Sequence, residues 1–282
     1  MNNKLSKISS LVLISSSVLL FDAYYNPNQA EAAALRPGFT GNTLPRNDDL
    51  STGLVNIGFT ANFFGVSRTQ VYVNNNGNVT FDQALSTYTP FDLNSTSRQI
   101  IAPFFADVDT RNPASSEVTY GQGSVDGRNA FGVNWNGAGV GFFNNRANPL
   151  NKFQLVMIDR SDVGAGDFDF EFNYDQILWE SGEASGSNER GLGGSSARVG
   201  YANGTGAPGT FFELPGSAVN GAFLDNGPAD TRLIGNSRNS DLDGRYVFEV
   251  RNGQVQPPAP EPEPEPPAPG TGQNTSPIGN SN

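Results

Sequence analysis

The sequence predicts an all-β protein, an antiparallel β-sandwich or open barrel of many short strands with a disordered proline-rich C-terminal tail. Glycine and proline are abundant, with 33 and 19 residues among 282, which favours turns over long helices. Six Asn-Gly and two Asp-Gly dipeptides separate short apolar runs, and such pairs accept the positive φ of tight hairpin turns. No useful stretch of helical periodicity occurs after the first 32 residues.

The clearest local unit is a hairpin over residues 70–81. Apolar and polar residues alternate on both sides of the turn Asn74–Gly77, which is a hairpin signature. Residues 99–106 form a continuous apolar run that predicts a buried strand bent at Pro103. Further strands are expected at residues 130–143, 153–158, 198–202, 210–214 and 245–251.

A strict alternation over residues 167–175 predicts one more strand. Its aromatic residues share one face, and Asp167, Asp169 and Glu171 lie on the other. We expect this acidic row to be a solvated face, or to protect an exposed edge strand from pairing with other chains. Cation binding by the row is the alternative.

Residues 1–32 predict a secretory signal peptide. Lys4 and Lys7 precede an apolar stretch at 8–21, and small residues flank a cleavage point before Ala33. The apolar stretch is shorter than the ~18 residues needed to span a bilayer. We therefore expect export, cleavage and a secreted, extracellular location.

The rest of the chain divides into three parts. A polar segment over 33–53 leads into a β domain over 54–252, and a tail rich in proline and glutamate covers 253–282. Residues 257–269 predict an extended polyproline II segment, roughly 40 Å long at ~3.1 Å per residue. No apolar helix follows it, so we expect no stable membrane anchor.

Charge and residue types exclude several functions. The formal net charge is −11, from 17 basic and 28 acidic residues, which argues against nucleic acid and anionic membrane surfaces as partners. The chain has no cysteine and no histidine. Disulfides, cysteine nucleophiles, histidine bases and histidine-ligated zinc are therefore impossible. A large exported domain without cysteine favours a bacterial protein over an animal extracellular one.

Asp107, Asp109 and Glu117 are the candidate metal ligands. The two aspartates follow the buried run at 99–106 and alternate onto one face, with Glu117 shortly after. Oxygen ligands suit calcium, which is the one cofactor that we consider. The alternative is that these carboxylates cap a turn or accept backbone N–H bonds.

The carboxylates near Trp179 and Glu180 raise an enzymatic alternative, a histidine-free glycosidase that uses two carboxyl groups. In a chain with 28 acidic residues, such proximity is expected by chance. We therefore predict no enzyme activity.

Eight segments together carry a family resemblance, because they occur in one order over residues 54–251. These are residues 71–81, 101–110, 131–135, 151–158, 170–179, 197–201, 212–217 and 244–248. The most specific is IAPFFADVDT at 101–110. The set resembles the nidogen-like (NIDO) domain of extracellular matrix and adhesion proteins, in a bacterial secreted type. That family usually has tryptophan where this chain has Phe105.

The resemblance implies a non-catalytic extracellular module associated with cell–matrix adhesion or with a matrix or biofilm. Its expected partner is an extracellular matrix protein or a surface polysaccharide. A structural surface component that assembles with copies of itself is the other non-enzymatic alternative. Neither composition nor motifs identify the ligand.

Overall fold

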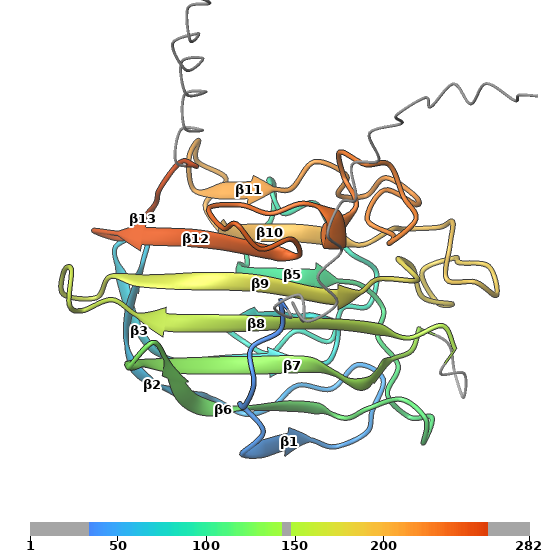
Figure 1. Cartoon of the computed structure of the whole chain (residues 1–282), viewed down its shortest axis with the longest axis horizontal. Coiled ribbons are helices and arrows are strands. Elements are labelled where there is room, and N and C mark those ends of the chain that lie inside the picture. Colours follow the sequence, from blue (N-terminus) through green and yellow to red (C-terminus); the bar gives the residue numbers. More distant parts are fainter. Residues whose placement is uncertain (1–33, 143–147, 259–282) are drawn as a thin grey trace, which may run out of the picture. The chain divides into compact units, whose positions relative to one another are not determined.

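The computed structural model describes residues 34–142 and 148–258. The predicted signal peptide, and the tail from residue 259 onwards, lie outside the described residues. The described chain forms two antiparallel sheets that pack face to face (Figure 1). Neither sheet closes on itself, so the predicted all-β sandwich is confirmed.

The first sheet has seven strands in the order β1-β6-β7-β8-β9-β12-β13. These strands are β1 Asn42–Leu44, β6 Val118–Val125, β7 Arg128–Val140, β8 Asn151–Asp159, β9 Phe168–Gln176, β12 Arg245–Arg251 and β13 Gln254–Val255. The second sheet has six strands in the order β11-β10-β5-β4-β3-β2. They are β2 Val55–Phe63, β3 Val66–Asn74, β4 Asn78–Thr80, β5 Gln99–Phe105, β10 Arg198–Asn203 and β11 Phe211–Glu213.

The core fills the space between the two sheets and is largely aromatic. Trp135 of β7 stacks on Phe153 of β8 with ring centroids 5.1 Å apart, and Phe170 of β9 stacks on Phe248 of β12 at 4.8 Å. Both pairs sit at cross-strand positions, where side chains on one face meet. Trp135 is fully buried, as expected for an alternating strand.

Tight turns join the strands where the sequence indicates them. Asp126-Gly127 connects β6 to β7 and Asn252-Gly253 connects β12 to β13, each with two positive φ angles. The hairpin of β2 and β3 was not predicted. It turns at Phe64-Gly65, again with two positive φ angles, and a phenylalanine at such a position carries no turn signal.

Pro103 lies inside β5, and the pairing of β5 with β10 is irregular around it. The register moves from Arg198 opposite Phe105 to Gly200 opposite Ala102, so β5 advances three residues while β10 advances two. Proline has no N–H to donate to a ladder. The extra residue therefore lies in β5, as a bulge at the point where Pro103 cannot bond regularly.

The chain segment before β1 crosses the outer face of the seven-stranded sheet (Figure 1). The backbone N–H of Arg36 donates to Gln154 Oε1 on β8 at 3.0 Å, and buried Phe39 packs with Val156 and Ile158 of the same strand. A Cβ atom at Gly132 of β7 would lie 2.3 Å from the Phe39 ring, so only glycine leaves room for the ring there.

Segments on both sides of the predicted β domain also take part in the fold. The segment 33–53 is part of the packed unit from residue 34 onwards, because it buries Phe39 and supplies β1. Likewise β13, at the start of the predicted tail, pairs with β12. Within 34–142 and 148–258, no helix has the length and apolar character to cross a membrane. The short 3-10 turn Leu233–Gly235 is the helical element there.

We expect Phe39→Ala to lower the free energy of unfolding by about 3 kcal/mol, because it empties a buried aromatic site. Urea denaturation followed by tryptophan fluorescence measures this change. Val163→Ala is the matched control, since that side chain is 56% exposed and should shift stability little. Equal effects of the two substitutions would show that the crossing segment does not stabilise the domain.

Candidate functional site

The turn between β3 and β4 is buried although it consists of polar residues. Asn74, Asn75 and Asn76 are at most 1% exposed. Gly77 allows this burial, because its φ is +72° and a Cβ atom there would lie 1.7 Å from the carbonyl oxygen of Phe104. A buried amide must find hydrogen-bond partners. Asn75 and Asn76 find their partners in loops from distant parts of the chain.

Asn75 and Asn76 join two loops. The Nδ2 of Asn75 donates to the backbone oxygens of Asp48 and Val108. The Nδ2 of Asn76 donates to Asp49 Oδ1 at 2.9 Å, and its Oδ1 accepts from the backbone N–H of Val108 at 2.8 Å. The buried turn therefore holds the 47–49 loop beside the 107–109 loop.

An acidic cavity of about 450 Å³ lies where these two loops meet the 183–184 loop. It is lined by Asp48, Asp49, Tyr88, Asp107, Asp109, Arg111, Phe142, Glu183 and Ala184. Carboxylate oxygens of Asp48, Asp49 and Asp107 all lie within 4.8 Å of one another. Gly182 leaves room for the Asp107 side chain in this group, since a Cβ atom at position 182 would lie 2.2 Å from it.

Burial and repulsion between carboxylates disfavour ionisation of Asp107 and Asp48. Burial, together with repulsion by the neighbouring Asp48 and Asp49, raises the pKa of Asp107 to about 7. Burial, with repulsion by Asp109, raises the pKa of Asp48 to about 6. Grouped oxygen ligands of this kind suit a divalent cation such as calcium, which would relieve the repulsion.

Of the three residues that the sequence nominated as metal ligands, Asp107 and Asp109 line the cavity. Asp107 belongs to the close carboxylate group, whereas Asp109 makes a two-point ion pair with Arg111, at 2.9 and 2.8 Å. Glu117 precedes β6 and is not among the residues that line the cavity. Asp48 and Asp49 are the carboxylates that lie close to Asp107. They lie about sixty residues before Asp107, and no spacing signal in the sequence links them to it.

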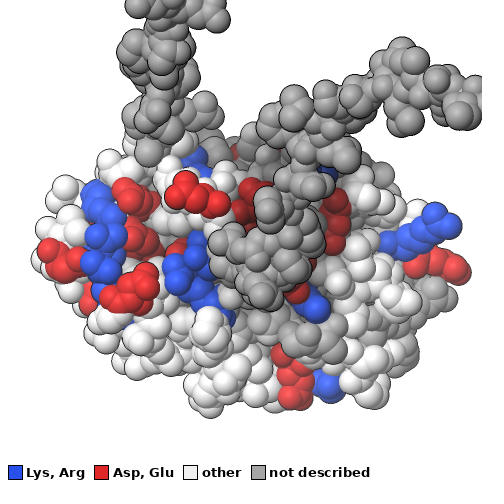
Figure 2. All heavy atoms as spheres, in the orientation of Figure 1, with Lys and Arg blue, Asp and Glu red and all other residues white. Residues whose placement is uncertain are grey.

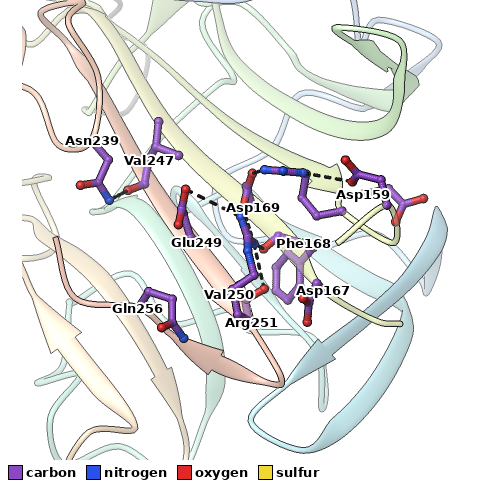
Figure 3. A network of polar contacts seen from close by, with 12 residues as sticks. Asp159, Asp167, Phe168, Asp169, Asn239, Val247, Glu249, Val250, Arg251 and Gln256 are labelled. Atoms are coloured by element: carbon purple, nitrogen blue, oxygen red, sulfur yellow. Dashed lines mark hydrogen bonds and ion pairs between the residues drawn. The ribbon is translucent and has the colours of Figure 1, made fainter. Parts of the chain in front are cut away.

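The acidic row of β9 is buried, so its prediction as a solvated face or edge guard is wrong. β9 lies between β8 and β12, and arginines from other segments cover it. Asp169 accepts from Arg251 and from Arg160, each at 2.6 Å. Figure 3 shows the Asp169–Arg251 contact within a wider polar network, and Figure 2 shows basic and acidic side chains interleaved over the end where β12 finishes.

Glu171, the next member of the row, is bound by the crossing segment. Arg36 donates to both of its oxygens, at 2.6 and 2.7 Å. Arg245 lies 3.9 Å from the same carboxylate. Asp169 and Glu171 are thus neutralised within the fold by arginines, whereas Asp167 accepts the backbone N–H of Asn252.

Glu180, the residue behind the enzymatic alternative, is fully buried. Its two oxygens accept the backbone N–H groups of Gly221 and Phe223. Burial raises the pKa of Glu180, while these two bonds oppose the shift. A carboxylate used in this way anchors the 214–227 loop and is not presented to a substrate.

Comparison with known proteins gives consistent matches. The family described as "Nidogen-like domain" matches residues 69–126 and 117–252. Mouse alpha-tectorin is 32% identical over 238 residues, which cover 76% of this chain and 10% of alpha-tectorin. Chicken alpha-tectorin is 31% identical, covering 80% of this chain and 11% of the relative.

Nidogen from Drosophila melanogaster is 27% identical over 275 residues, covering 87% of this chain and 19% of the relative. The chain therefore spans about a tenth to a fifth of the length of these curated relatives. No solved structure matches it significantly.

The raised pKa of Asp107 predicts a specific pH dependence of stability. The folded protein holds this proton more tightly than the unfolded chain, where an aspartate titrates near 3.8. The contribution of this bound proton to the stability of the folded protein is complete below about pH 4 and is lost as pH rises through 7. Asp107→Asn should therefore gain stability relative to the wild type, by on the order of 2 kcal/mol between pH 4.5 and 8.

Urea denaturation in calcium-free buffer at both pH values measures this difference. Asp162→Asn is the control, because its arginine neighbours lower the pKa of Asp162 to about 2. That group stays ionised throughout the range, so its variant should show a constant offset from the wild type. A constant offset for Asp107→Asn as well would show that Asp107 titrates normally.

Proposed function

Because this chain belongs to the nidogen-like domain family, we propose that it acts as an exported, non-enzymatic binding module that associates with an extracellular matrix. The family match carries the proposal. It runs from residue 69 to 252, from within β3 to the end of β12, and includes two of the three loops that line the acidic cavity. Asp48 and Asp49 precede the matched region.

Export is the second support. The first 32 residues have the charge and apolar pattern of a cleaved signal peptide, which agrees with an extracellular module. We place the module in a bacterial exported protein, since the chain holds no cysteine, although the matched relatives are animal proteins. Its partner in this proposal is a matrix protein or a surface polysaccharide.

Calcium is part of the proposal, with a changed ligand set. Asp48, Asp49 and Asp107 are the ligands, because their oxygens lie within 4.8 Å of one another. Asp109 is held by Arg111, so it stabilises the loop instead of coordinating the ion. A bound cation would tie the 47–49 loop to the 107–109 loop and stiffen this end of the sandwich.

The matrix proposal predicts saturable retention of the folded chain on isolated native extracellular matrix. The bait is the full exported chain, and the same chain after heat denaturation is the control. Retention that is no higher for the folded bait than for the denatured one contradicts the proposal. Sedimentation of the purified chain with and without calcium tests the alternative, since large assemblies without matrix would indicate a self-assembling surface component.

The calcium proposal predicts a higher melting temperature in calcium than in chelator at pH 8. Ligand at about 100 times its Kd stabilises a fold by about 2.7 kcal/mol, or roughly 5–10 °C for a domain of this size. Asp49→Asn should remove most of the shift. Glu117→Gln should leave the calcium-dependent shift in melting temperature intact, because Glu117 lies outside the cavity. If Glu117→Gln removes the shift instead, the ligand set expected from the sequence is favoured.

A further inference from the structure

A second recess, on the outer face of the six-stranded sheet, has a different chemistry from the acidic cavity. Its volume is about 310 Å³. It opens beside β3, whose residues Arg68, Gln70 and Tyr72 alternate outward while Val71 and Val73 point into the core. Leu54 and Asp82 complete its rim.

The recess forms because the 82–98 loop covers only part of this face. The loop packs Leu85, Phe91 and Leu93 on β5 and β10, against Ile100, Phe105 and Ala202. Arg98 holds the base of the loop through the backbone oxygens of Gln83 and Ala84. The part of this face that β3 forms lies outside the packed cluster. It is left uncovered beside the loop, and the recess lies there.

Arg68 has no carboxylate partner among the described residues. Its Nη2 donates to the side-chain oxygen of Gln99, and its buried Nε has no hydrogen-bond partner in the part of the chain that the structure describes. The acidic residue of the rim, Asp82, lies 3.4 Å from Arg98 and is compensated there. One net positive charge is therefore left at the recess, in a chain whose net charge is −11.

We propose that this recess binds a saccharide that carries a singly charged anionic group, either a uronic acid carboxylate or a sulfate monoester. A guanidinium is suited to such groups. The neutral side chains around it, Thr69, Gln70 and Tyr72, can donate to or accept from sugar hydroxyls. Inorganic phosphate fits less well, because a single uncompensated cation faces the recess.

This site deepens the proposed matrix association by naming a class of partner, and it rests on that function for its biological setting. It is independent of the acidic cavity. The two share no lining residue, so binding at one can be removed without changing the other.

The test is calorimetric titration of the full exported chain with three probes: tetragalacturonate, a sulfated disaccharide and neutral maltotetraose. We expect one or both anionic probes to bind, the neutral probe to bind at least tenfold more weakly, and added salt to weaken binding. The probe that binds identifies the source of the charge. Equal binding of the neutral probe, or no binding of either anionic probe, overturns the proposal.

Matched arginine variants locate the site. Arg68→Gln should weaken binding at least tenfold, whereas Arg128→Gln, which removes an exposed arginine paired with Asp162, should leave it unchanged. Equal losses in both variants would show nonspecific attraction and would overturn the assignment. Tyr72→Phe, which keeps the ring and removes the hydroxyl, gives a second readout if Arg68→Gln lowers the melting temperature.

The matrix assay separates this proposal from the proposed function. Saccharide binding that is lost in Arg68→Gln supports the recess even where the folded chain is not retained on matrix. Retention on matrix by a chain that binds none of the anionic probes supports the matrix function and rejects the recess.

Discussion

The hydrogen bonds of the buried asparagine turn hold together the loops that line the acidic cavity. Asn75 and Asn76 bind backbone and side-chain atoms of two loops that are about sixty residues apart in sequence. Trp135 in the core donates its indole N–H to the backbone carbonyl oxygen of Asn75 at 2.9 Å. Leaving any of these buried groups unpaired would cost about 1–3 kcal/mol. The acidic cavity thus depends on a turn that is itself fixed by the core.

A second constraint is the neutralisation of charge within the fold. The chain carries an excess of acidic residues, yet Asp169 and Glu171 of β9 are buried and bound by arginines from both ends of the domain. With these carboxylates compensated by arginines, the other charged side chains are distributed unevenly over the domain. Carboxylates crowd together in the cavity, and Arg68 in the recess of β3 has a buried Nε without a hydrogen-bond partner in the described part of the chain. These two places are the proposed sites for a cation and for an anion.

The crossing segment before β1 shows how a sandwich of this family can cover an outer face without helices. Phe39 occupies the space left by Gly132, while Arg36 binds Glu171. The segment makes both polar and apolar contacts within a short stretch of chain, so it packs on the outer face of the sheet as an additional layer. The outer face of the other sheet is covered by the 82–98 loop instead, and incompletely. The recess beside β3 follows from that difference.

The sequence by itself determined the strands and turns, because both depend on neighbouring residues. Alternation located β9 and β12, and Asn-Gly and Asp-Gly pairs located two hairpin turns. The β2–β3 hairpin was missed, since its turn at Phe64-Gly65 has no such signal. Only the tertiary structure decided which carboxylates meet. Alternation shows which residues share a face but not what covers it, and the partners of Glu171 and Asp169 lie 135 and 82 residues away. Asp48 and Asp49 reached Asp107 in the same way, through asparagines of a third segment.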